Sequence, residues 1–132
     1  WLAALTAWLR TELNTHPDLA LLGDFNIAPE DRDVYDPKAW EGKVLCSATE
    51  RAALSALIEL GLKDSFRLFD QPERSFTWWD YRMNAFRRDM GLRIDLMLAS
   101  KALVERCTSF TIDRAPRTSS RRSPHRSPRS AR

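Results

Sequence analysis

Two polar side chains that could bind a metal ion follow a short apolar segment near the start of the chain. Residues 19–22 are typical of a strand buried on both faces, and Asp24 and Asn26 follow directly after Gly23. A spacing of two places both side chains on one side of the chain if the strand stays extended. Their oxygens suit Mg²⁺, and an asparagine amide can also donate to a phosphate oxygen. The alternative is structural: Asp24 caps the following turn and Asn26 lies in an Asx-turn.

A second carboxylate, Asp95, lies inside an apolar segment. Apolar residues alternate with other residues over 92–99, which predicts a core strand that carries this aspartate. A carboxylate in such a strand is costly to bury unless it is paired, hydrogen-bonded or close to a metal ion. One interpretation is therefore a functional carboxylate. The other is an ordinary ion pair with Arg93, two positions away, on a solvated face of the sheet.

Aromatic and arginine side chains cluster after residue 75. Four of the six residues from Phe76 to Tyr81 are aromatic, and three arginines follow at positions 82, 87 and 88. Such a segment could stack on bases and contact phosphates. Alternatively the aromatic side chains belong to the core, and we expect this for at least two of them. Strand alternation then directs one of Trp78 and Trp79 inward and the other outward.

The elements that would position these residues follow from the periodicity of the sequence. Leucines at positions 2, 5, 9 and 13 predict a helix that ends near Asn14. Ser47 and Glu50 fit a capping box at the start of a helix with a buried leucine stripe, which Gly61 ends. A short strand and turn are predicted at 62–69, and further strands at 75–79, 92–98 and 107–112. A helical turn is predicted at 100–104, and loops at 28–45 and 80–91. Interleaved helices and strands indicate an α/β fold.

Charge is divided unevenly along the chain. Residues 1–113 carry 14 basic and 18 acidic residues, a net charge of −4, whereas residues 114–132 carry seven arginines and no acid. The body is therefore mildly acidic, without an overall signature of nucleic-acid binding. The last segment is rich in Arg and Ser and has too few apolar residues to form a core, so we predict disorder. We therefore divide the chain into a folded domain, 1–113, and a tail, 114–132.

The cellular setting follows from what the sequence lacks. No apolar run approaches the roughly 18 residues of a transmembrane helix, so no membrane partner is expected. Cys46 and Cys107 are too few for a disulfide framework, and their spacing is not that of zinc ligands. We interpret them as reduced thiols and expect a cytoplasmic protein.

Taken together, these segments resemble exonuclease III, the apurinic/apyrimidinic endonuclease of the endonuclease/exonuclease/phosphatase superfamily. The resemblance runs from Trp1 to about Arg117. It is carried by LLGDFNIAPEDRDVYDPKAW, by ERAAL with GLKDSFR, by SFTWWDYR and by GLRIDLMLAS. GDFN is shared across the superfamily, whereas WWDYR and GLRIDL are much more specific to this family.

The resemblance implies the second half of a four-layered α/β sandwich. It also implies bound Mg²⁺, with Mn²⁺ as an alternative, and hydrolysis of phosphodiesters in duplex DNA at 3′ ends and abasic sites. Asp24 matches the aspartate that activates the attacking water. Asn26 matches its partner on the scissile phosphate and the metal, and Asp95 matches the supporting carboxylate.

The same resemblance assigns one DNA contact, to which two arginines of the predicted set are added. Trp78 matches the aromatic residue that probes the DNA at the lesion, and Arg82 and Arg93 complete the predicted DNA-binding set. His125 falls where the histidine of the family's closing Ser-Asp-His motif is expected, although Pro124 stands in place of the aspartate.

The chain departs from the family at both ends. The family's first half supplies an asparagine, a metal-binding glutamate and a catalytic tyrosine that cannot be assigned here, so an N-terminal half is an expected partner. The abrupt change of composition after Asp113 predicts an out-of-frame end. We therefore expect this chain to be an inactive fragment of a DNA repair nuclease.

Two other functions stay open. The Arg-rich tail and residues 78–88 could form a non-catalytic nucleic-acid-binding module. The chain could also belong to another phosphodiesterase of the superfamily, acting on lipid or inositol phosphates. The SFTWWDYR and GLRIDL segments argue against this last interpretation.

Overall fold

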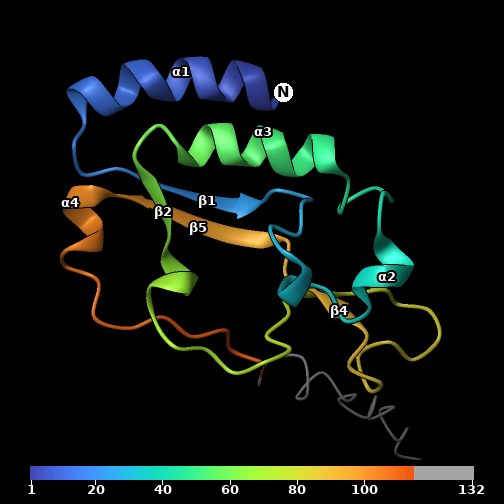
Figure 1. Ribbon diagram of the computed structural model, residues 1–132. Helices are drawn as coiled ribbons and strands as arrows, with labels where there is room; N and C mark the ends of the chain where they lie inside the picture. Colours follow the sequence, from blue (N-terminus) through green and yellow to red (C-terminus); the bar gives the residue numbers. More distant parts are fainter. Residues whose placement is uncertain (115–132) are drawn as a thin grey trace, which may run out of the picture.

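A three-stranded antiparallel sheet lies at the centre of the structure (Figure 1). The computed structural model describes residues 1–114. The strands lie in the order β1 (Ala20–Asp24), β5 (Asp95–Ser100) and β2 (Leu62–Asp64). Two helices, α1 (Leu2–Thr15) and α3 (Ala48–Ile58), stack over one face. The predicted α/β class is confirmed, and one sheet with one helical side corresponds to half of a four-layered sandwich.

Short elements complete the described part of the chain. A two-stranded antiparallel ribbon, β3 (Trp78–Trp79) and β4 (Gly91–Leu92), lies beside the main sheet. The remaining elements are η1 (Asp31–Asp33), α2 (Pro37–Trp40), η2 (Ser65–Leu68) and α4 (Lys101–Val104). The helical turn predicted at 100–104 is confirmed by α4. No helix among residues 1–114 is long and apolar enough to span a membrane.

The main hydrophobic core lies between the helices and the sheet. Leu9 of α1 and Leu54 and Leu57 of α3 are buried against Leu96 and Leu98 of β5. Because side chains alternate along a strand, Asp95 and Met97 must project from the opposite face of the sheet. The leucine periodicity therefore correctly predicted both helices, and it also determines which residues the sheet presents on its other side.

The start of α3 is fixed by the predicted capping box. The Ser47 hydroxyl accepts a hydrogen bond from the N–H of Glu50, and the Glu50 carboxylate accepts bonds from the Ser47 N–H (3.0 Å) and hydroxyl (2.6 Å). Partial burial acts to raise the pKa of Glu50, but these bonds and one from the Leu45 N–H lower it below the ordinary value. The carboxylate therefore stabilises the helix start in its charged form.

The opposite face of the sheet is largely uncovered. Residues 19–22 were predicted to be buried on both faces, and this prediction is wrong: Leu22 is 64% exposed. It lies opposite Met97 in the register of β1 and β5, so the two form an apolar strip on the side away from α1 and α3. The apolar run correctly predicted a strand. It did not show how many faces of that strand residues 1–114 cover.

Two other strand predictions need correction. Residues 107–112 form no strand and lie in an irregular segment, in which the carbonyl of Phe110 accepts a bond from Gln71 Nε2 at 3.0 Å. The single strand predicted over 92–98 is divided into β4 and β5, with Arg93 and Ile94 between them. This break decides where the neighbouring charged side chains point.

Candidate active site

The two aspartates singled out in the sequence lie directly opposite each other. Asp24, the last residue of β1, pairs with Asp95, the first residue of β5. Residues paired in this way share a face of the sheet, with Cβ atoms about 4.5–5.5 Å apart. Both side chains are exposed, at the end of the Leu22–Met97 strip. Like charges in direct opposition destabilise a sheet, so this pair favours a cation beside it.

Asn26 reaches the same region through a turn rather than an extended strand. β1 ends at Asp24, and Asn26 has a φ of 53°. Its backbone N–H donates to Asp24 Oδ1 at 2.8 Å, which is the Asx-turn of the structural alternative. The backbone is therefore not extended through Asn26, so the condition for placing both side chains on one side of a strand is not met. The side chain of Asn26 is nevertheless exposed and follows immediately after the aspartate pair.

Arg93 does not lie on a DNA-binding surface, and this prediction is wrong. Only 1% of the residue is exposed, and its guanidinium lies between Asp33 (Nε–Oδ1, 2.7 Å) and Asp64 (Nη2–Oδ2, 2.7 Å). The alternative of a surface pair with Asp95 is also wrong. Arg93 lies in the break between β4 and β5, where its N–H donates to the carbonyl of Asp33 at 2.9 Å, so strand alternation no longer applies.

The buried arginine stays charged because its partners outweigh its burial. Burial acts to lower the pKa of Arg93, but hydrogen bonds to Asp33 and Asp64 raise it above its usual value. Arg67 also contacts Asp33, and the guanidiniums of Arg67 and Arg93 lie 4.9 and 4.8 Å from the ring centre of Phe66. This buried network joins η1, the β2–η2 segment and the start of β5.

Sequence analysis missed Asp33 and Asp64 as partners in this network. Asp33 lies in the segment predicted as a loop, 60 positions from Arg93, and Asp64 lies 29 positions from it. No local spacing connects such residues. The one available signal was an acidic residue in DVYDPK that would need a partner if the loop packed against the sheet.

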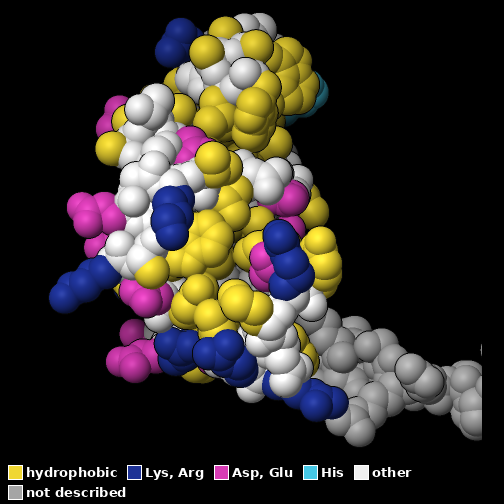
Figure 2. Space-filling model, turned by 90° about the vertical axis from the view of Figure 1, so that its right-hand side faces the viewer, with side chains coloured by type: hydrophobic (Ala, Val, Ile, Leu, Met, Phe, Trp, Pro, Cys, Tyr) yellow, Lys and Arg dark blue, Asp and Glu magenta, His cyan; other side chains and the backbone are white. Residues whose placement is uncertain are grey.

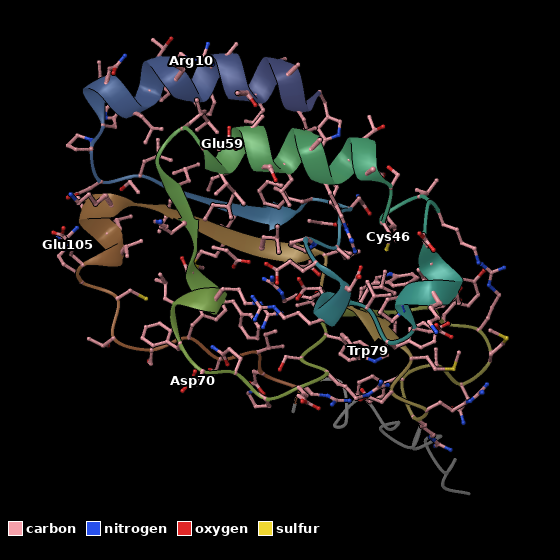
Figure 3. All side chains as sticks on the ribbon, viewed as in Figure 1. Arg10, Cys46, Glu59, Asp70, Trp79 and Glu105 are labelled. Atoms are coloured by element: carbon pink, nitrogen blue, oxygen red, sulfur yellow. The ribbon has the colours of Figure 1, made fainter. Side chains whose placement is uncertain are left out.

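The two tryptophans divide as strand alternation predicts. Trp79 is buried in edge-to-face contact with Phe76 (6.4 Å between ring centres) and Phe86 (5.0 Å). Trp78 is half-buried and packs beside a second core cluster that includes Leu92. Figure 3 places Trp79 beneath β4, among aromatic side chains. Trp78 therefore has one exposed part, and its contact with DNA stays a prediction.

Arg82 lies in an exposed loop between β3 and β4. Its guanidinium contacts the Asp80 carboxylate at 3.2 Å and lies 5.2 Å from the ring centre of Tyr81, which is 91% exposed. Arg87 and Arg88 are also exposed. On the face drawn in Figure 2, Lys and Arg side chains gather along the lower edge, below a hydrophobic centre. Arg82, Arg87 and Arg88 place positive charge at the surface, and their contact with phosphates stays a prediction.

Two predictions fall partly or wholly outside the described residues. His125 and the tail after Arg114 belong to the segment that the structure does not describe.

Cys46 and Cys107 are both free, as predicted. Burial raises the pKa of the Cys46 thiol, so this side chain is not a reactive nucleophile.

The aspartate pair fits a hard cation with a partly hydrated shell. Residues 1–114 hold no group of three or more His, Cys, Asp or Glu side chains that could bind a metal. Mg²⁺, however, usually keeps several waters and binds proteins through one or two carboxylates. Asp24 and Asp95 supply two, and the Asn26 amide oxygen is close in sequence. A cavity of about 280 Å³, lined by Leu22, Thr77, Asp95 and Phe110 among others, opens beside the pair.

Comparison with known proteins connects this geometry to a family. Residues 1–125 match the model of the endonuclease/exonuclease/phosphatase family. The chain is 37% identical over 117 residues to exodeoxyribonuclease III of Haemophilus influenzae, and the match covers 83% of this chain and 44% of that protein.

Two solved structures show the same fold. A 3′ phosphatase from Neisseria, bound to a product DNA hairpin, superposes with a TM-score of 0.88 at 44% identity, covering 93% of this chain and 48% of that one. An AP endonuclease from Archaeoglobus fulgidus gives a TM-score of 0.82 at 33% identity, covering 89% and 46%. This chain thus spans less than half the length of each relative. Because the family model matches almost all of its residues, the chain belongs to the endonuclease/exonuclease/phosphatase family.

Proposed function

We propose that this chain is part of a DNA repair nuclease of the exonuclease III type, which hydrolyses phosphodiesters of duplex DNA at 3′ ends and abasic sites. The observation that carries the proposal is the direct opposition of Asp24 and Asp95 on an open face of the sheet. The names of its relatives support the choice of substrate: one is an exodeoxyribonuclease, one an AP endonuclease and one a 3′ phosphatase solved with DNA.

Each residue of the proposed site has a chemical task. Asp24 accepts the proton of the attacking water, and the turn bond from the Asn26 N–H holds its carboxylate in place. The Asn26 side-chain amide donates to an oxygen of the scissile phosphate. Asp95 adds the second negative charge that a divalent cation requires. Mg²⁺ or Mn²⁺ bound here would neutralise charge that develops on the phosphate oxygens.

The described residues supply only part of such a site. Two carboxylates and one amide leave most positions around an octahedral ion to water or to another segment. We therefore propose that an N-terminal half completes the nuclease and that this chain alone cleaves DNA poorly. We also propose that the complete protein acts in the cytoplasm, because free thiols persist there.

A chimera tests this function. Residues 1–114 would replace the matching segment of H. influenzae exodeoxyribonuclease III, with circular dichroism to verify folding. We expect Mg²⁺-dependent incision of a duplex with one abasic site. The rate should fall on the order of 10³-fold in Asp24→Asn, as when a member of a cooperating site is lost. Asp31→Asn, which changes an exposed aspartate, serves as the control. A folded chimera whose rate Asp24→Asn leaves unchanged would contradict the proposal.

A second candidate function is metal-independent binding of nucleic acid, favoured by the exposed Tyr81 and Arg82. In that case the affinity of the chain for a DNA duplex would fall steeply with salt and would survive Asp24→Asn. Deleting residues 115–132 would separate the contribution of the tail from that of the loop. Affinity unchanged by both the deletion and Arg82→Ala would exclude this function.

A further inference from the structure

The loop between β3 and β4, residues 80–90, holds three exposed arginines in a shape that needs support from outside the loop. Three of its residues, Met83, Asn84 and Asp89, have φ values of 52°, 55° and 53°. Residues other than glycine rarely adopt this left-handed region, and such conformations persist only where surrounding contacts hold them. The contacts that hold this loop therefore determine where its arginines lie.

Two arginines from outside the loop bind Asp89, the next-to-last residue of the loop. Asp89 Oδ2 accepts a hydrogen bond from Arg74 Nε at 3.0 Å, and its Oδ1 accepts one from Arg114 Nη2 at 3.2 Å. Arg74 Nη2 also donates to the backbone carbonyl of Asp89. These three residues are called the Asp89 clamp below. The clamp joins the end of the loop to the segment before β3 and to the last residue that the structure describes.

Both arginines of the clamp lie over aromatic side chains. The guanidinium of Arg74 is 5.4 Å from the ring centre of Phe76. The guanidinium of Arg114 is 5.2 Å from the ring centre of Trp79 and 5.4 Å from that of Phe86. Isolated surface ion pairs contribute little to stability, but several charges in one network are an exception. The clamp therefore fixes the end of the loop against the aromatic cluster, although its side chains are partly exposed.

Hydrogen bonds inside the loop connect this fixed end to Arg82. The N–H of Met90 donates to the carbonyl of Ala85 at 2.9 Å. The N–H of Ala85, which is buried, donates in turn to the carbonyl of Arg82 at 3.2 Å. A change at the clamp would therefore alter the position of Arg82 through the backbone, without any direct contact between Asp89 and Arg82.

We infer that Asp89 is a positioning residue for DNA binding: the clamp holds the loop so that Arg82 contacts a phosphate, and Asp89 itself does not touch the DNA. This inference rests on the proposed function, because that function gives the loop a DNA duplex to contact. Arg114 of the clamp also lines a cavity of about 320 Å³ together with Asp95, so the clamp holds the loop beside the proposed active site.

The negative charge of Asp89 allows the two possible roles of its carboxylate to be separated by the direction of the effect. A carboxylate on a surface that binds phosphates repels DNA, so the loss of its charge alone would strengthen binding. If Asp89 positions Arg82, the neutral variant Asp89→Asn should weaken binding instead, because both clamping arginines lose their ionic partner. A purely electrostatic role and a positioning role therefore predict opposite changes in affinity.

The test uses the 132-residue chain and a fluorescent DNA duplex with one abasic site, with binding measured by anisotropy at one fixed salt concentration. The variants are Asp89→Asn, Arg82→Ala and the two combined. Glu73→Gln is the matched control: Glu73 is exposed and precedes Arg74 in the chain, so this variant removes the same charge and leaves the clamp intact.

We expect Arg82→Ala to weaken binding about tenfold, the loss of one hydrogen bond to a charged group, and Asp89→Asn to weaken it about threefold. The combined variant should bind no more weakly than Arg82→Ala, because Asp89 acts through that arginine. Glu73→Gln should bind as tightly as the wild type or more tightly. Urea midpoints of all variants should stay close to that of the wild type, since the clamp is partly exposed.

The outcomes separate the inference from the function on which it rests. Equal or tighter binding by Asp89→Asn overturns the inference, because the carboxylate then acts only by repulsion. Losses that add in the combined variant also overturn it, because Asp89 then acts apart from Arg82. Wild-type binding by Arg82→Ala overturns the inference too. A wild-type chain that binds no duplex contradicts the proposed function itself, and the positioning role fails with it.

Discussion

Asp33→Ala would remove the carboxylate that the buried ion network shares among three parts of the fold. Asp33 is 0% exposed and accepts hydrogen bonds from the Glu30 N–H at 3.1 Å and from Arg93 at 2.7 and 3.2 Å, besides its contact with Arg67. Removing one partner of a buried ion pair typically costs about 3–5 kcal/mol. Arg93 keeps its bonds to Asp64 at 2.7 and 3.2 Å. We therefore expect the lower end, about 3 kcal/mol.

Urea unfolding followed by tryptophan fluorescence measures this loss. A loss of about 3 kcal/mol would lower the unfolding midpoint by roughly 1 M urea or more. Asp31→Ala, two positions away, is the matched control. Asp31 is also bonded to an arginine, Arg51, at 2.8 Å, but its side chain is 74% exposed, so we expect at most about 1 kcal/mol. Equal midpoints for the two variants would refute the assignment of Asp33 and Arg93 to a buried network.

Three further predictions follow from the described contacts. Gly91→Ala should destabilise the fold by about 1–3 kcal/mol in urea unfolding, because its Cβ would lie 2.5 Å from Trp79 Nε1; a wild-type midpoint would contradict this. The lowered pKa of Glu50 means that its capping bonds stabilise the fold above about pH 4.5 and are lost as the pH falls through the folded-state value. Glu50→Gln should therefore reduce the loss of thermal stability between about pH 5 and pH 3, and an identical pH profile would argue against it. Arg82→Ala should weaken duplex DNA binding and lower its salt dependence by about one ion, whereas Arg10→Ala, on the outer side of α1 (Figure 3), should not.

Local signals in the sequence correctly predicted the elements that surround the site. The capping box at Ser47 and Glu50, the leucine spacing of α1 and the alternation of Trp78 and Trp79 each depend on neighbours within a few residues. Asp24 was also assigned correctly to the end of a strand, whereas Asp95 was expected inside a strand and is the first residue of β5. Their direct opposition was not predictable, because it depends on the register between segments 71 positions apart.

Arg93 shows why the remaining features could not be predicted. Its position within an alternating segment placed it on the same face as Asp95, but the break before β5 turns it into the interior. Its partners come from two distant parts of the chain. Leu22 shows a different limit. An apolar strand indicates that both of its faces are suited to burial, but not that residues 1–114 cover both faces. The irregular course of residues 107–112 likewise depends on contacts such as that of Gln71 with Phe110.

The most direct test of the central claim is Mn²⁺ binding to the wild-type chain, to Asp24→Asn, to Asp95→Asn and to the double variant. If the two carboxylates hold one cation, each single substitution should remove most of the affinity, and the double variant should bind little more weakly than either. This strong non-additivity is the expected sign of residues that act together. Additive losses, or single variants that bind as the wild type does, would show that Asp24 and Asp95 do not share a metal ion.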